Sequence, residues 1–169
     1  MFDRMKSGGK KIVRWFLRIT FAAALVSVAL LGLFSSKTYP RQWEISLIVS
    51  PSAIEFSPGD PDLEPVTAAS SPVRIQISTW PPNRRWEITL RAEGNLVSSA
   101  GEIIPVSSIS WKATPQPPFN DGVLAAGQSQ LLGRGRGYEQ GEVSFYFQNS
   151  WSYPSGEYSQ VITITASLI

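Results

Sequence analysis

The chain ends on YPSGEYSQVITITASLI, residues 153–169, and this stretch decides the fold class. The triplet Pro154-Ser155-Gly156 is typical of a turn, and residues 157–168 are rich in Tyr, Val, Ile and Thr, which favour strands. Alternate side chains of a strand point to opposite faces. One face of this strand therefore carries the apolar residues Ile162, Ile164, Ala166 and Leu168.

A long strand with one apolar face needs partners, because an open apolar edge invites aggregation. We expect residues 157–168 to pair either with an earlier part of the chain or with another subunit. The sequence leaves both open; in the first case the terminal strand closes the chain's own barrel-like fold from its edge.

The same alternation recurs along residues 43–49, 73–78, 86–91, 109–111 and 143–147. The residues that it places in a core are Trp43, Ile45, Leu47, Val73, Ile75, Ile77, Trp86, Ile88, Leu90, Trp111, Phe145, Phe147, Ile162 and Ile164. Pro81 and Pro82 mark a turn, so the second and third runs are expected to form a hairpin. With no helical period after residue 36, the pattern predicts an all-β fold: an Ig-like or pilin-like antiparallel β-sandwich, preceded by one N-terminal hydrophobic helix.

Several motifs resemble those of exported bacterial β-sandwich domains. These are W-x-I-x-L-x-V-x-P-x-x-I-x-F followed by Pro-Gly at 43–59, W-x-I-x-L-x-A at 86–92, P-x-S-x-I-x-W at 105–111, and the closing PSGEYSQVITITAS. Together they are similar to WxL-type surface domains and to pilin-like proteins of the spore-coat-U kind. The first resemblance implies binding to peptidoglycan, and the second implies polymerisation by strand exchange.

The N-terminal part is typical of an export leader. Six basic residues precede residue 19, and residues 19–36 form an apolar segment that is either a cleaved signal peptide or a transmembrane anchor. We therefore expect a basic cytoplasmic region at 1–18, a spacer at 37–42 and the β-sandwich at 43–169. The folded part is expected to be extracytoplasmic, either secreted or anchored in the cytoplasmic membrane with its C-terminus outside.

Composition excludes several classes of function. The chain has no Cys and no His, so it lacks thiolate sites and the usual general base at neutral pH. From Lys37 onward twelve acidic residues outnumber nine basic ones, which argues against nucleic-acid binding. Only Lys37 and Lys112 lie beyond the leader as lysine bases, neither in a Ser-x-x-Lys arrangement. We expect no enzyme activity and no cofactor.

Two loop segments have alternative interpretations. The alternating carboxylates Asp60, Asp62 and Glu64 suit Ca²⁺, but a solvated acidic turn is favoured and no metal site is predicted. The glycine-rich stretch 131–142 resembles a phosphate cradle or an RGG-like segment. A flexible hairpin loop with exposed Arg134 and Arg136 is favoured instead.

Surplus aromatic residues are the candidate ligand contacts. They fall in turns or on the outward phase of strands: Trp80, Tyr138, Tyr146, Trp151 and Tyr153. Such rings suit a sugar face or a protein partner; the alternative is that they cover the ends of the sandwich. The sequence therefore predicts a surface module that binds cell-wall polymer or a surface protein, with the membrane as a partner through residues 19–36 if they are retained. A pilin-like subunit is the alternative.

Overall fold

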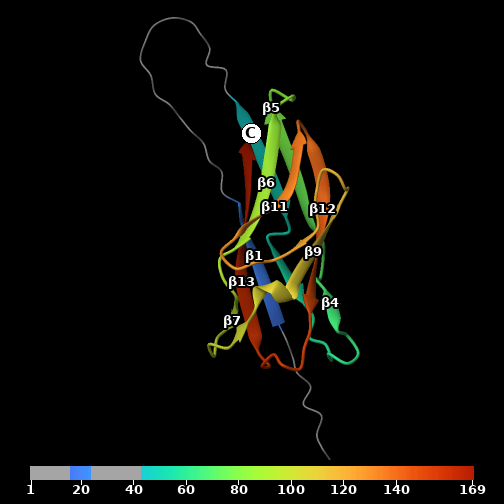
Figure 1. The fold of residues 1–169 in the computed structure, drawn as a ribbon, viewed down its shortest axis with the longest axis vertical. Helices are drawn as coiled ribbons and strands as arrows, with labels where there is room; N and C mark the ends of the chain where they lie inside the picture. The colour runs from blue at the N-terminus through green and yellow to red at the C-terminus, as the bar shows by residue number, and fades with distance from the viewer. Residues whose placement is uncertain (1–15, 24–42) are drawn as a thin grey trace, which may run out of the picture.

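The computed structural model describes residues 16–23 and 43–169, and at 16–23 it describes the backbone alone. Nearly all regular structure in this part is β-strand; the exception is one short 3-10 turn, η1 (Val106–Ser108). The strands form two sheets that lie against each other as two layers (Figure 1). The predicted all-β class is therefore confirmed, as two mainly antiparallel sheets in a sandwich arrangement.

The first sheet, sheet A, has the strand order β11-β6-β13-β1-β3, with β7 paired to β13 and β8 paired to β7. Its strands are β1 (Phe16–Ala23), β3 (Ala53–Phe56), β6 (Arg85–Ala92), β7 (Leu96–Ser98), β8 (Ile103–Ile104), β11 (Ser129–Arg136) and β13 (Glu157–Leu168). Strand β1 runs parallel to β13, and the other strand pairs of the described part of this sheet are antiparallel. Sheet A thus joins segments from distant parts of the chain.

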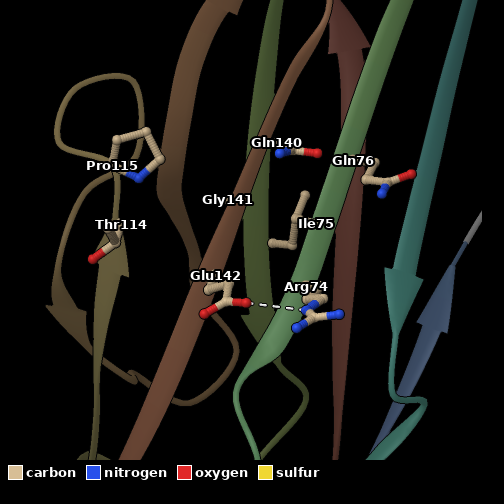
Figure 2. A pocket seen from close by; sticks show the side chains of 8 residues that line it. All are labelled: Arg74, Ile75, Gln76, Thr114, Pro115, Gln140, Gly141 and Glu142. Carbon is tan, nitrogen blue, oxygen red and sulfur yellow. Dashed lines mark hydrogen bonds and ion pairs between the residues drawn. The ribbon is translucent and has the colours of Figure 1, made fainter.

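The second sheet, sheet B, has the order β10-β9-β12-β5-β2, with β4 paired to β12. Its strands are β2 (Glu44–Ser50), β4 (Val66–Ala68), β5 (Val73–Trp80), β9 (Ile109–Thr114), β10 (Gly122–Val123) and β12 (Glu139–Gln148). Its outward face carries polar residues of β5 and β12, and Figure 2 shows Arg74 of β5 and Glu142 of β12 pointing toward each other there. Residues of β5 alternate between buried and exposed positions along the strand. The buried ones, on the inward face, are mainly apolar.

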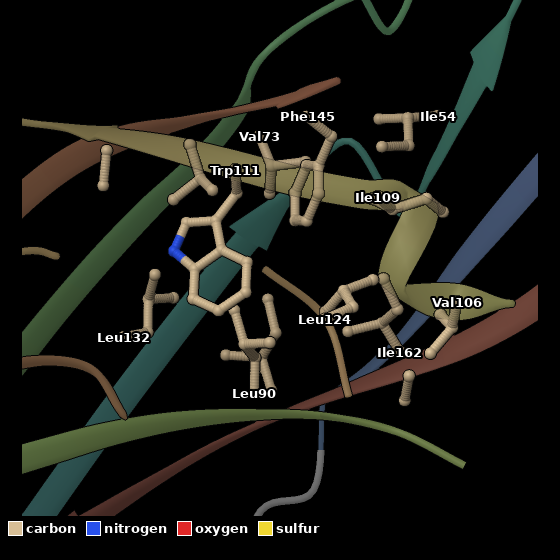
Figure 3. Packing of buried hydrophobic residues seen from close by; sticks show 14 of the residues in the cluster. Ile54, Val73, Leu90, Val106, Ile109, Trp111, Leu124, Leu132, Phe145 and Ile162 are labelled. Atoms are coloured by element: carbon tan, nitrogen blue, oxygen red, sulfur yellow. The ribbon is translucent and has the colours of Figure 1, made fainter. Parts of the chain in front are cut away.

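Between the sheets lies one hydrophobic core, to which both layers contribute (Figure 3). Most of the residues predicted for this core are buried, namely Val73, Ile75, Ile77, Trp86, Ile88, Leu90, Trp111, Phe145, Phe147, Ile162 and Ile164. Ile45 and Leu47 are partly buried and pack against it. Trp43 was predicted inside as well, but it is 57% exposed. It precedes the first residue of β2, and its ring stacks on the guanidinium of Arg84, 3.6 Å from the ring centroid.

The predicted hairpin of residues 73–78 and 86–91 is wrong. Strand β5 belongs to sheet B and pairs with β2 and β12, whereas β6 belongs to sheet A and pairs with β11 and β13. The turn after Trp80 therefore carries the chain from one layer to the other. Alternation could not distinguish these cases, because both strands bury every second residue in the same core.

The glycine-rich stretch is also not the predicted flexible loop. Gly133 and Gly135 lie within β11, opposite Ile88 and Trp86 of β6. A Cβ atom on Gly135 would lie 2.4 Å from Cζ2 of Trp86, so the tryptophan can occupy the core because this position has no side chain. The true turn is at Gly137, whose φ of 70° favours glycine.

Residues 16–23 overlap the predicted basic region and the predicted apolar segment. At 19–23 the described backbone belongs to strand β1, which pairs with β13 on one side and β3 on the other; the N-terminal helix stays a prediction. The remainder of that predicted helix (24–36), the spacer (37–42) and residues 1–15 lie outside the described residues. No helix in the described ranges is long and apolar enough to cross a membrane.

Candidate functional site

The first candidate site is a seam in sheet A, between β13 and β3, that is filled by β1. Eight consecutive residues of β1 pair in parallel with β13, from Phe16 opposite Glu157 to Ala23 opposite Ile164. On its other side β13 pairs with β6 and β7. The terminal strand therefore pairs with earlier parts of its own chain, one of the two arrangements that the sequence left open, and with β1 beside it, it is a central strand of sheet A rather than an edge strand.

Among the described strands of sheet A, β3 pairs with β1 alone, with Leu17 opposite Phe56 and Thr20 opposite Ala53. Its side chains Ile54 and Phe56 are 1% and 2% exposed, so they belong to the core. The opposite edge of β3 is held by the backbone N–H of Ser70, which donates to the carbonyl of Glu55 at 2.7 Å. Without β1, the facing edges of β13 and β3 would both present unpaired N–H and C=O groups, which is what an added strand requires.

The start of β13 is anchored by Tyr158, a residue to which sequence reasoning assigned no role. Its side chain is buried, and its hydroxyl donates a hydrogen bond to the carbonyl of Pro154, 2.9 Å away. Burial, and after it the negative charge of Glu102, raise the pKa of Tyr158 above its usual value of 10.0, whereas a hydrogen bond with Ser98 acts in the opposite direction. This contact fixes the turn Pro154-Ser155-Gly156 against the strand that borders the seam.

The second candidate site is a polar cleft of about 420 Å³ on sheet B (Figure 2). It is lined by residues from three strands and the loop after β9: Arg74, Ile75, Gln76, Thr114, Pro115, Gln140, Gly141 and Glu142. The strand register places Gln140 opposite Gln76 and Glu142 opposite Arg74. An ion pair joins Arg74 Nε to Glu142 Oε1 at 3.0 Å. Sequence reasoning missed this cleft, because polar residues on an outward phase look alike until strand register brings them together.

The structure separates the five candidate aromatics. Trp80 and Tyr138 are 65% and 60% exposed, and Tyr138 donates a hydrogen bond from its hydroxyl to Oε1 of Gln140, 3.0 Å away, at the cleft. Tyr146 is half-buried on β12. Tyr153 packs against the core, with its ring centroid 6.0 Å from that of Phe147. Trp151 is exposed at the other end of β12. Of the five, Tyr138 thus combines high exposure with a contact to a cleft residue, and Trp80 is exposed at the far end of β5, the strand that supplies Arg74 and Gln76 to the cleft.

The acidic loop is held by local hydrogen bonds. Asp60 Oδ1 accepts from the backbone N–H of Asp62 at 2.9 Å, and Asp62 Oδ1 accepts from the indole of Trp151 at 2.9 Å. Asn149 donates to the carbonyls of Gly59 and Glu64, which ties the loop to the end of β12. The described residues hold no group of three or more side chains suited to a metal ion.

Comparison with known proteins identifies no family for this chain. No known protein family matches the chain, and no curated protein matches it. The two-layer fold, the seam and the cleft are therefore the basis of the functional argument.

Proposed function

We propose that the protein is a non-enzymatic envelope module of a bacterium that works outside the cytoplasm and accepts a strand in the seam between β13 and β3. One observation carries this proposal: β1, which precedes the rest of the sandwich in the chain, lies between the two strands and runs parallel to β13. Such completion of a sheet by an added strand is a known route to linking protein subunits.

The strand that fills the seam has two incompatible uses. Residues 19–23 belong to β1, and they are also the start of the apolar segment 19–36 that we expect to act in export or anchoring. A backbone segment cannot pair in sheet A while it spans a bilayer as a helix. Use of this segment in the membrane therefore opens the seam to the equivalent strand of a second copy, which would link subunits as pilin-like proteins do.

The contact of Tyr158 supports the finer class of an Ig-like or pilin-like sandwich. In Ig-like folds a buried tyrosine near the start of a late strand bonds through its hydroxyl to backbone a few residues upstream. Here the hydroxyl of Tyr158, at the second position of β13, bonds to the carbonyl of Pro154. Rigid attachment of β13 at this point keeps one wall of the seam in place.

Cysteine pairs test the proposal cleanly, because the chain has no native cysteine. Thr20 lies opposite Val161 in the parallel register, and neighbouring strands are about 4.8 Å apart, which suits a disulfide. We expect the full-length double variant Thr20→Cys/Val161→Cys to form a disulfide on mild oxidation. We expect a mixture of the two single variants to form disulfide-linked pairs of chains, seen by non-reducing electrophoresis and intact mass.

A matched control uses Thr20→Cys with Ser167→Cys, because Ser167 lies beyond the part of β13 that pairs with β1. This combination should not cross-link. A bond only within the chain would contradict exchange and favour a closed binding module. No bond in either arrangement would show that the seam does not accept this strand.

A further inference from the structure

The outer face of sheet B carries a ligand site that is separate from the seam. We propose that the cleft between β5, β12 and the end of β9 binds a neutral polysaccharide chain, laid along β5 from Arg74 toward Trp80. The seam lies in sheet A and this cleft in sheet B, so the inference does not depend on strand exchange. Its residues differ from those that the sequence predicted, except for Trp80 and Tyr138.

Strand register builds the site in rows across the sheet. Gln76 of β5 lies opposite both Gln140 of β12 and Ile48 of β2. One row away, Arg74 lies opposite Glu142, which in turn lies opposite Thr114. Directly opposed side chains on one face are about 5 Å apart. The cleft therefore offers two carboxamides, a hydroxyl and an ion pair within one surface.

These groups suit a ligand that is rich in hydroxyl groups. A carboxamide both donates and accepts hydrogen bonds, as a sugar hydroxyl does. The hydroxyl of Tyr138 donates to Oε1 of Gln140, which leaves the amide nitrogen of Gln140 to donate to a ligand. Arg74 and Glu142 neutralise each other at 3.0 Å, so the cleft has no net charge to attract a phosphate or a carboxylate. The ligand is therefore neutral.

Exposed rings continue the same face beyond the cleft. Trp80 is the last residue of β5 and has the outward phase of Arg74 and Gln76. The six steps along the strand from Arg74 to Trp80 span about 20 Å, enough for an extended chain of several sugar units. Rigid aromatic rings provide flat apolar area against which the faces of sugar rings pack. The strand thus presents an aromatic platform at one end and polar contacts at the other.

Other classes of macromolecule fit this surface less well. A peptide that binds by adding a strand needs a free strand edge, but β5 is paired on both sides, with β2 and β12, and β12 is paired with β5 and β9. A nucleic acid needs unpaired cations, whereas Arg74 of the cleft is bound to Glu142. Neither limit applies to a polysaccharide, which binds through hydroxyl groups and ring faces.

The test uses the full-length chain and two soluble probes, the hexamer of N-acetylglucosamine and the hexamer of glucose. Two-dimensional NMR should show, for at least one probe, saturable shifts of the side-chain amide signals of Gln76 and Gln140 and of the indole signal of Trp80. Gln76→Ala/Gln140→Ala should weaken binding at least tenfold, as should Trp80→Ala. Each variant must keep the dispersed spectrum of the folded protein.

Gln128→Ala is the matched control, because Gln128 is an exposed glutamine beside β11 of sheet A. It should bind as the parent does. Absence of shifts with both probes at millimolar concentration would overturn the proposal. So would binding that the glutamine variants leave unchanged, or a charged probe, such as a short single-stranded DNA, that shifts the same signals more strongly.

Discussion

The two sheets of this protein differ in what completes them. The strands of sheet B come from residues 44–148 and pair antiparallel throughout the described part. Sheet A includes the terminal strand β13 and is completed by β1, a parallel strand from residues 16–23. Sheet B is therefore complete without β1, whereas sheet A depends on it. Residues 19–23 of β1 are also expected to act in export or anchoring. The proposed linking of molecules therefore concerns sheet A, and the proposed recognition of a ligand concerns the outer face of sheet B.

The largest expected effect compares the central tryptophan of each layer. Trp86 of sheet A and Trp111 of sheet B are 0% and 2% exposed, and truncating either one to alanine should lower the free energy of unfolding by about 3–5 kcal/mol. Because both rings contribute to one core, each variant should unfold in a single transition in urea. Two separate transitions would show that the layers are independent and would break the comparison.

Substituting phenylalanine at the same two positions tests a finer difference between the two layers. The indole N–H of Trp111 donates to the carbonyl of Asn120 at 2.7 Å, whereas that of Trp86 is buried with no partner among the described residues. Trp111→Phe should therefore cost about 1 kcal/mol more than Trp86→Phe. Equal losses in urea unfolding would contradict this difference.

Adding a methyl group beneath each tryptophan gives the next effect. A Cβ atom at Gly135 would lie 2.4 Å from the ring of Trp86, and one at Gly122 would lie 2.3 Å from the ring of Trp111. Both alanine variants should lose about 1–3 kcal/mol by overpacking. Gly94→Ala is the control, because the nearest atom to a Cβ there is the end of the Gln160 side chain, 3.5 Å away. Gly101 is unsuitable because its φ is positive.

Tyr158 gives a pH-dependent prediction for the wall of the seam. Its pKa in the folded state lies above the unfolded value of 10.0, so the folded protein binds the phenolic proton more tightly. The resulting stability is fully present below pH 10.0 and is lost as the pH rises through the folded pKa. Tyr158→Phe should cost about 1 kcal/mol at neutral pH, and the gap to the parent should narrow at alkaline pH. A constant gap in unfolding experiments from neutral pH upward would contradict this account.

The smallest effect compares one surface ion pair on each sheet. On sheet B, Arg74 binds Glu142 with one contact, and their side chains are 73% and 49% exposed. On sheet A, Arg134 places both Nε and Nη2 within 2.7 Å of Glu87 Oε2, and Glu87 is only 22% exposed. Double-mutant cycles should give couplings below about 1 kcal/mol for both pairs, larger for Arg134 with Glu87. Raising the salt concentration should reduce both; a larger coupling on sheet B would contradict the ranking.

Local pattern was a good guide wherever a strand has one face in the core. The alternation in residues 73–77 and 86–90 identified strands and their inward faces correctly, because burial of every second side chain does not depend on the partner strand. The prediction that Trp43 is buried was wrong, because Trp43 lies one residue before the first residue of β2. The prediction of a flexible loop at 133–136 was wrong for another reason. These residues have poor strand propensity, but they pair with β6, and the ring of Trp86 needs the space at Gly135.

The candidate sites depend more on long-range pairing. The outward residues Arg74, Gln76, Gln140 and Glu142 are ordinary polar residues in the sequence, and only strand register places them around one cleft. Trp80 and Tyr138 were chosen from their loop or outward positions, and they are exposed, but Tyr153 packs against the core. Sequence pattern cannot separate these cases, because exposure depends on which other segments cover a side chain.

By itself the sequence determined that this protein is built of strands with one buried face, since composition and a period of two are local properties of the chain. Only the tertiary structure decided which layer each strand joins, that β13 is central, and that residues 16–23 complete sheet A. The physical reason is that backbone hydrogen bonds between strands are specified by partner and register, and neither is encoded in the hydropathy of one segment alone.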